Sequence, residues 1–181
     1  MSDNTRSLAY GCLIALVGML TYANSLSGPM LFDDHTAIVR NPQIRRLWPP
    51  TDALAAARDN ELASRPLVNL SFAINYAFGG LAVRGYHLVN VGMHILSALV
   101  LFGIIRRTLT IAAPPGRVAG AAEGIALVSA MIWMVHPLLT ESVDYLTQRT
   151  ELMMGLFYLL TLYAAIRAAG GARPSDLPKG R

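Results

Sequence analysis

The chain has 181 residues, of which 54% are hydrophobic and only 14% are charged. Soluble domains carry about 25% charged residues, so this composition argues against a soluble globular protein and is typical of a membrane protein with several spans. The formal net charge of +4 therefore gives no reason to expect nucleic acid as a partner, and the single cysteine excludes an intramolecular disulfide.

Four apolar segments predict an all-α integral membrane fold with about four transmembrane helices. They span about residues 8–26, 86–105, 121–137 and 150–167, so that residues 1–167 form one membrane module. An α-helix rises about 1.5 Å per residue, so about 20 apolar residues cross a bilayer. The first segment is longer than the apolar core of a usual signal peptide, which favours an uncleaved anchor over a cleaved leader. Arg106-Arg107 is expected to end the second span.

A long polar loop, residues 27–85, separates the first two spans and is expected to carry short interfacial helices. The clearest of these helices is signalled by Ser64 as N-cap, Pro66 in the first turn and Gly79-Gly80 at the end. At about 15 residues this helix is short for a span, so we expect it to lie along the membrane surface. A buried packing helix is the alternative.

Asp33 and Asp34 lie in this loop, shortly after the first apolar segment. Carboxylates are costly to bury, so an adjacent pair near a membrane indicates either a working site or an ordinary solvated loop. A second acidic stretch, residues 140–151, precedes the last span. If that stretch is one helix, four of its polar side chains share a face: Glu141, Asp144, Gln148 and Glu151.

Polar residues also recur within the second span. His87, Asn90 and His94, followed by Ser97, are spaced by three, four and three residues, which places them on one helical face. Polar side chains in a spanning helix rarely face lipid, so we expect hydrogen bonds to neighbouring helices. A metal site shared by the two histidines is disfavoured, because seven residues of helix separate them by about 10.5 Å along the axis.

Charge asymmetry predicts the orientation. With the N-terminus inside, four crossings return the C-terminus inside, and the inner segments carry a net charge of +5 against −1 outside. This distribution follows the positive-inside tendency. It places both termini in the cytoplasm, with residues 168–181 as a basic cytoplasmic tail, and puts Asp33-Asp34 on the outer side. High Ala and Arg content with little Lys favours a bacterial inner membrane.

A set of short motifs recurs in order along the chain. They are Tyr22-Ala-Asn-Ser25, Phe32-Asp-Asp34, Asn41-Pro42, Arg65-Pro-Leu67, Asn75-Tyr76, Gly85-Tyr-His-Leu-Val-Asn90, His94, His136-Pro137, Thr140-Glu141 and Arg149-Thr-Glu-Leu152. As an ordered set they resemble the start of the membrane-embedded O-mannosyltransferase-like proteins that carry tetratricopeptide repeats, which belong to the GT-C superfamily of glycosyltransferases.

The resemblance implies a transferase that uses a lipid-linked sugar. The donor would be a polyprenyl-phosphate carrying a mannose-like sugar, and the acceptor a hydroxyl of a protein or glycan outside the cytoplasm, as in protein O-glycosylation. In GT-C enzymes an acidic motif in the first outer loop is the catalytic signature, and here Asp33-Asp34 holds that position. We expect Asp33 to act as general base. Asp34 would orient it or, with Glu141, help to hold a divalent cation such as Mg²⁺ or Mn²⁺.

The phosphate of such a donor would need positive charge. Arg65 and Arg149 are the candidates, because a guanidinium suits bidentate phosphate contact; anchoring to lipid headgroups is the alternative for each. Glu141 and His136 are placed with them among the substrate-binding residues, and a structural role is the alternative for His136.

The chain departs from the family pattern in its extent. A GT-C core has more than four spans, and no helical repeat of about 34 residues is recognisable here. We therefore expect the chain to be an N-terminal fragment, completed by a missing C-terminal part or a partner chain. The alternative function is a non-catalytic four-helix membrane scaffold or partner subunit, or an inactive remnant of such an enzyme. A transporter is a more distant third.

Overall fold

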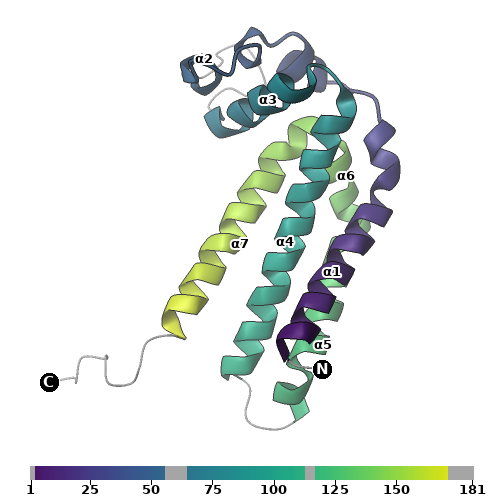
Figure 1. Ribbon diagram of the computed structural model, residues 1–181, viewed down its shortest axis with the longest axis vertical. Helices are drawn as coiled ribbons and strands as arrows, with labels where there is room; N and C mark the ends of the chain where they lie inside the picture. The colour runs from purple at the N-terminus through teal and green to yellow at the C-terminus, as the bar shows by residue number, and fades with distance from the viewer. Residues whose placement is uncertain (1–2, 56–64, 113–116, 171–181) are drawn as a thin grey trace, which may run out of the picture.

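The computed structural model describes residues 3–55, 65–112 and 117–170, and every regular element within these ranges is helical. Four long helices run side by side as a bundle (Figure 1): α1 (Asp3–Thr21), α4 (Val83–Ala112), α5 (Arg117–Met134) and α7 (Arg149–Ala169). The helix α4 lies at the centre and contacts the other three. Two shorter helices, α2 (Thr51–Leu54) and α3 (Pro66–Gly79), lie over one end of the bundle.

Short helical turns also occur between the longer helices in the described part of the chain. They comprise α6 (Thr140–Asp144), the 3-10 turns Ala23–Ser27, Pro42–Ile44, Pro137–Leu139 and Leu146–Gln148, and the π-helical turn His35–Val39. The residues that follow α1, together with α2 and α3, form one compact unit, which we call the cap (residues 28–55 and 65–82). The predicted basic tail lies outside the described residues from residue 171 onward.

Two helices are long and apolar enough to cross a bilayer, Val83–Ala112 and Leu146–Ala169. A third crossing arises if Gly120–Met134 and Pro137–Asp144, which meet at a bend of 54°, form one broken span. Thr5–Thr21 is a shorter apolar helix. The expectation of an all-helical membrane protein is therefore confirmed, with two or three candidate spans among the described residues.

One boundary prediction was wrong, and one condition set by the sequence is not met. Arg106-Arg107 does not end the helix, since α4 continues to Ala112; Arg is a good helix former, and Arg106 finds partners on α1 and α5. The acidic stretch 140–151 is not one helix, because Tyr145 adopts an extended backbone between α6 and the turn before α7. Its polar residues therefore do not share one continuous face.

The start of α3 also differs in detail from the prediction. Its N-cap is Arg65, whose side chain makes no capping hydrogen bond, and Ser64 lies outside the described residues. Pro66 opens the helix, where its missing N–H costs nothing. The predicted end is confirmed, because Gly80 follows Gly79 with a φ of +56°, a conformation that glycine adopts without steric cost.

The bundle core depends on small residues where helices approach closely. Ala98 on α4 and Ala126 and Ala130 on α5 are fully buried. Gly18 marks the tightest approach, because a Cβ there would lie 2.7 Å from Ile95 Cγ1 and 3.0 Å from Met134 Sδ. Small residues allow such backbone proximity in membrane bundles, so these positions set the packing of α1 against α4 and α5.

The cap has an apolar core of its own. Ile38, Ile44, Ala53 and Phe72 are fully buried there, and Tyr86 joins this core to α4. The helix α3 buries Phe72 on one face yet exposes apolar side chains on another, at Leu67, Ile74 and Phe78. The long loop is thus a folded unit, and α3 combines the packing role with an apolar surface.

Candidate functional site

Asp34 is buried where the chain leaves α1 and enters the cap. Its Oδ2 accepts a hydrogen bond from the Leu31 amide at 3.0 Å. Its Oδ1 accepts from both the amide and the hydroxyl of Thr147, at 2.9 and 2.7 Å. Three donors compensate the carboxylate for lost hydration. Asp34 therefore fastens the start of the cap to the turn before α7.

Asp33, the neighbour of Asp34, has the opposite environment. It is exposed, and its carboxylate has no hydrogen-bond partner among the described residues. Its amide lies 3.1 Å from the Tyr145 hydroxyl, to which it donates. Phe32 before it has a φ of +42°, is 82% exposed and meets the Tyr145 ring edge to face at 6.5 Å. A left-handed backbone is costly for a bulky residue and often marks a functional site, and this turn presents Asp33 beside the exposed Phe32 and the half-buried Tyr145.

Arg149, the first residue of α7, is fully buried. Its guanidinium donates four hydrogen bonds: to Asn90 Oδ1 at 2.8 Å, Asn75 Oδ1 at 2.6 Å, Tyr86 O at 2.9 Å and Ser71 Oγ at 3.3 Å. It also lies 4.4 Å above the Phe72 ring. No carboxylate forms an ion pair with it in the described part of the chain. Neutral acceptors and aromatic faces thus hold a buried cation that joins α3, α4 and α7.

Arg65 lies next to this buried group but is exposed. Its Nη1 is 3.4 Å from the hydroxyl of Thr150, the residue after Arg149. Residues 147–150 therefore gather contacts from three separate parts of the chain, at Asp34, Arg65 and Asn90. Two of the predicted site residues, Asp34 and Arg65, therefore contact threonines that lie within two positions of a third, Arg149.

Glu141 and His136 lie apart from that meeting point in the hydrogen-bond network. Both are exposed, and His136 Nδ1 accepts a hydrogen bond from the Leu138 amide, which caps a 3-10 turn. Among the described residues no group of three or more His, Cys, Asp or Glu could hold a metal ion. Asp34 already binds protein donors through both oxygens, so this arrangement offers a divalent cation no ready ligand set. The Asp34 and Glu141 cation site remains a prediction.

The polar stripe of α4 is buried and directed at neighbouring elements, as its spacing predicts. His94 Nε2 lies 2.9 Å from Met134 O, and its ring stacks on Trp133 at 4.8 Å. His87 Nε2 lies 3.3 Å from Gly28 O. Asn90 accepts from Arg149 and donates to Val143 O at 3.3 Å. These contacts connect α4 to α5, to α6 and to the start of the cap.

The sequence does not indicate the partners of several residues in this region. Thr147 is an ordinary threonine until the fold places it against Asp34, 113 residues away. Asn75 belongs to the Asn75-Tyr76 motif, yet its hydrogen bond to Arg149 spans 74 residues. Asn41 and Asn69 hydrogen-bond each other at 2.8 Å inside the cap. Only the recurrence of Asn and Ser along the buried face of α3 could have drawn attention to such partners.

Comparison with known proteins identifies relatives over most of the chain. It is 31% identical to human protein O-mannosyl-transferase TMTC4 over 172 residues, 86% of this chain and 22% of that protein. It is 32% identical to Drosophila melanogaster protein O-mannosyl-transferase Tmtc1 over 83% of this chain and 17% of that protein. It is 29% identical to human protein O-mannosyl-transferase TMTC1 over 97% of this chain and 21% of that protein. The chain thus spans about a fifth of these relatives. No family model and no solved structure matches significantly.

Proposed function

Because the chain is homologous over most of its length to part of the protein O-mannosyl-transferases, we propose that it forms part of the membrane module of such a glycosyltransferase. The donor is a polyprenyl-phosphate carrying a mannose-like sugar, and the acceptor is a hydroxyl of a protein. The relatives are protein O-mannosyl-transferases, which supports the sugar and the protein acceptor. The apolar helices support a donor with a lipid tail.

The reaction centre of this proposal is Asp33. The acceptor oxygen attacks the anomeric carbon of the sugar while the bond from that carbon to the phosphate oxygen breaks, and polyprenyl phosphate leaves. Asp33 takes the proton of the hydroxyl as general base. Its exposed carboxylate supports this role, since it has no partner among the described residues. Asp34 is a positioning residue, because its three hydrogen bonds hold the turn that carries Asp33.

Arg65 is the better placed of the two arginines to meet the donor phosphate. It is exposed at the cap end of α7, where only a long contact to Thr150 engages it. Arg149, the residue before Thr150, is buried with its donors already used, so it contributes its positive charge rather than direct contact. The two guanidinium charges stabilise the leaving phosphate, and a divalent cation held by Asp34 and Glu141 stays a separate prediction.

The membrane arrangement belongs to the same proposal. We place four spans across a bacterial inner membrane, with both termini in the cytoplasm and the cap outside. The apolar lengths of α4 and α7, the broken span through α5 and the shorter helix Thr5–Thr21 support the four crossings. The clustering of the cap and the proposed site at one end of the bundle supports a single reaction side (Figure 1).

The observation that carries the proposal is the opposite treatment of two adjacent carboxylates, with Asp34 buried and fully hydrogen-bonded and Asp33 exposed. We therefore test Asp33→Asn in native membranes that contain the gene product, measuring transfer of labelled sugar from polyprenyl phosphate to a Ser/Thr peptide. Loss of a general base lowers the rate by about 10²–10⁴-fold. Asp52→Asn, an equal charge change at another exposed cap residue, is the control and should retain full activity. Normal transfer by Asp33→Asn would refute the assignment.

One observation favours a second function, a non-catalytic scaffold. Asp34 and Arg149 both direct their hydrogen bonds to the chain itself, which a purely structural protein would also require. Under this alternative the native membranes show no transfer that depends on the protein. The two functions are separated by comparing wild-type membranes with membranes that lack the gene product.

A further inference from the structure

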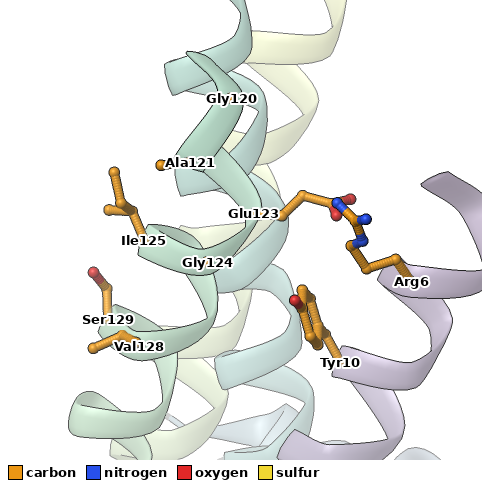
Figure 2. A pocket seen from close by; sticks show the side chains of 9 residues that line it. All are labelled: Arg6, Tyr10, Gly120, Ala121, Glu123, Gly124, Ile125, Val128 and Ser129. Carbon is orange, nitrogen blue, oxygen red and sulfur yellow. The ribbon is translucent and has the colours of Figure 1, made fainter. Parts of the chain in front are cut away.

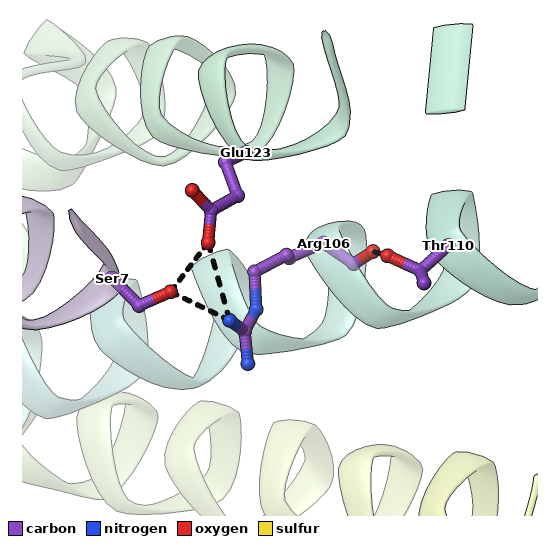
Figure 3. A network of polar contacts seen from close by, with 4 residues as sticks. All are labelled: Ser7, Arg106, Thr110 and Glu123. Carbon is purple, nitrogen blue, oxygen red and sulfur yellow. Dashed lines mark hydrogen bonds and ion pairs between the residues drawn. The ribbon is translucent and has the colours of Figure 1, made fainter. Parts of the chain in front are cut away.

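A second polar region lies at the end of the bundle opposite the cap, where α1 and α5 begin and α4 and α7 end (Figure 1). Arg106 Nη1 donates to Ser7 Oγ at 2.6 Å and lies 3.4 Å from Glu123 Oε1. The Ser7 hydroxyl donates to the same carboxylate oxygen (Figure 3). This network joins α1, α4 and α5 but uses only part of the positive charge present.

A cavity of about 530 Å³ opens beside the network. Three arginines line it, Arg6, Arg106 and Arg107, whereas Glu123 is the one carboxylate among its described lining residues. The cavity therefore carries an excess of two positive charges. The Nε of Arg107 is buried and has no hydrogen-bond partner in the described part of the chain. The excess positive charge of the lining therefore suits an anion, and the unpaired Nε shows that the Arg107 guanidinium is not fully satisfied within the described residues.

A second cavity, of about 550 Å³, adjoins the first and shares Arg6, Gly120 and Glu123 with it. Figure 2 shows Arg6 and Glu123 facing each other between α1 and α5, with Tyr10 one turn along α1. From there the cavity follows α5 past Gly124, where an added Cβ would meet no atom within 4 Å. The basic cavity thus continues into an unfilled, largely apolar groove.

We propose that these adjoining cavities bind an anionic phospholipid. The phosphate lies on Arg6, Arg106 and Arg107, and one acyl chain follows the groove along Gly120 and Gly124. Guanidinium groups suit phosphate oxygens, and basic pockets between membrane helices recognise acidic headgroups. A free phosphate ion would satisfy the arginines but leave the groove empty, so the groove favours the lipid.

The first test uses the full chain purified in detergent and titrated with phosphatidylglycerol, followed by native mass spectrometry. Phosphatidylcholine with the same acyl chains is the comparison ligand. Wild type should bind phosphatidylglycerol more tightly, and Arg107→Gln should weaken that binding about tenfold, the effect of losing one charge-assisted contact. Arg84→Gln removes an equal charge from an exposed position at the other end of α4 and should leave binding unchanged. Equal weakening by both variants, or equal binding of both lipids, would overturn the proposal.

A second variant distinguishes a lipid from a free phosphate. Gly124→Leu fills the groove with a good helix former and meets no neighbour at Cβ, so the protein should fold normally. It should weaken phosphatidylglycerol binding while inorganic phosphate, measured by calorimetry, binds as in wild type. Gly155→Leu on α7, where an added Cβ also meets nothing within 4 Å, is the matched control. If Gly124→Leu binds phosphatidylglycerol as well as wild type does, the groove does not hold an acyl chain and the lipid assignment fails.

Discussion

The link between Asp34 and Thr147 should make a measurable contribution to stability. In Thr147→Val the side chain keeps its shape but loses the hydroxyl that donates to Asp34 Oδ1 at 2.7 Å in a buried setting. Hydrogen bonds to charged groups contribute about 1.5–3 kcal/mol. The Thr147 amide continues to donate to the same oxygen, so we expect a loss near the lower end, about 1.5–2 kcal/mol.

The assay is reversible unfolding of the chain in mixed micelles, followed by circular dichroism, for the two single variants and the double variant. Asp34→Asn alone should cost more, because the Leu31 amide and Thr147 would face an amide group that supplies only one acceptor oxygen. The double variant should be less destabilised than the sum of the singles by about 1–2 kcal/mol, because the two residues interact directly.

Thr161→Val is the matched control for this cycle. It removes an exposed hydroxyl on α7 whose hydrogen bond goes to Phe157 O within the same helix, so its effect should stay within about 0.5 kcal/mol. Additive effects of Asp34→Asn and Thr147→Val, or a Thr147→Val variant as stable as Thr161→Val, would refute the structural role of this link.

Two further predictions concern packing and the membrane surface. Gly18→Val should destabilise the bundle by about 1–3 kcal/mol, because the added side chain overpacks against Ile95 and Met134. The same unfolding assay measures this loss. Gly155→Val is the control and should cost less than about 1 kcal/mol, because the space around Gly155 is open. If the cap rests on the bilayer, brominated lipids should quench the fluorescence of Trp48, which is 83% exposed, when it is measured in a Trp133→Phe background. Phe78→Asp, a change on the exposed apolar face of α3, should reduce that quenching. Trp48 fluorescence that brominated lipids do not quench would place the cap away from lipid.

The helices and the face of α4 that turns inward could be predicted because they depend on local patterns. Apolar runs of spanning length located the long helices, Pro66 and Gly80 marked the limits of α3, and the three- and four-residue spacing of His87, Asn90 and His94 indicated the buried face. Each of these signals lies within one helix, so no knowledge of tertiary partners was needed.

The polar network of the cap end could not be predicted, because its contacts join distant parts of the chain. Nothing near Thr147 in the sequence indicates Asp34, and nothing near Arg149 indicates that its donors bind Asn75 and Asn90. The extended backbone at Tyr145 escaped prediction for a related reason. That residue contacts Phe32 and the Asp33 amide, and those contacts arise only in the folded chain.

The polar residues at the cap end are of two kinds, buried and exposed, and the amino-acid composition does not reveal which is which. Asp34 and Arg149 are buried with their hydrogen bonds used within the chain, whereas Asp33 and Arg65 are exposed. Each exposed group lies beside a buried one: Asp33 is adjacent to Asp34, and Arg65 contacts Thr150, the residue after Arg149. Substituting a buried member should therefore lower the folded population and activity together. Substituting an exposed member should lower transfer while stability is retained, so measuring both quantities on the same variants separates positioning from chemistry.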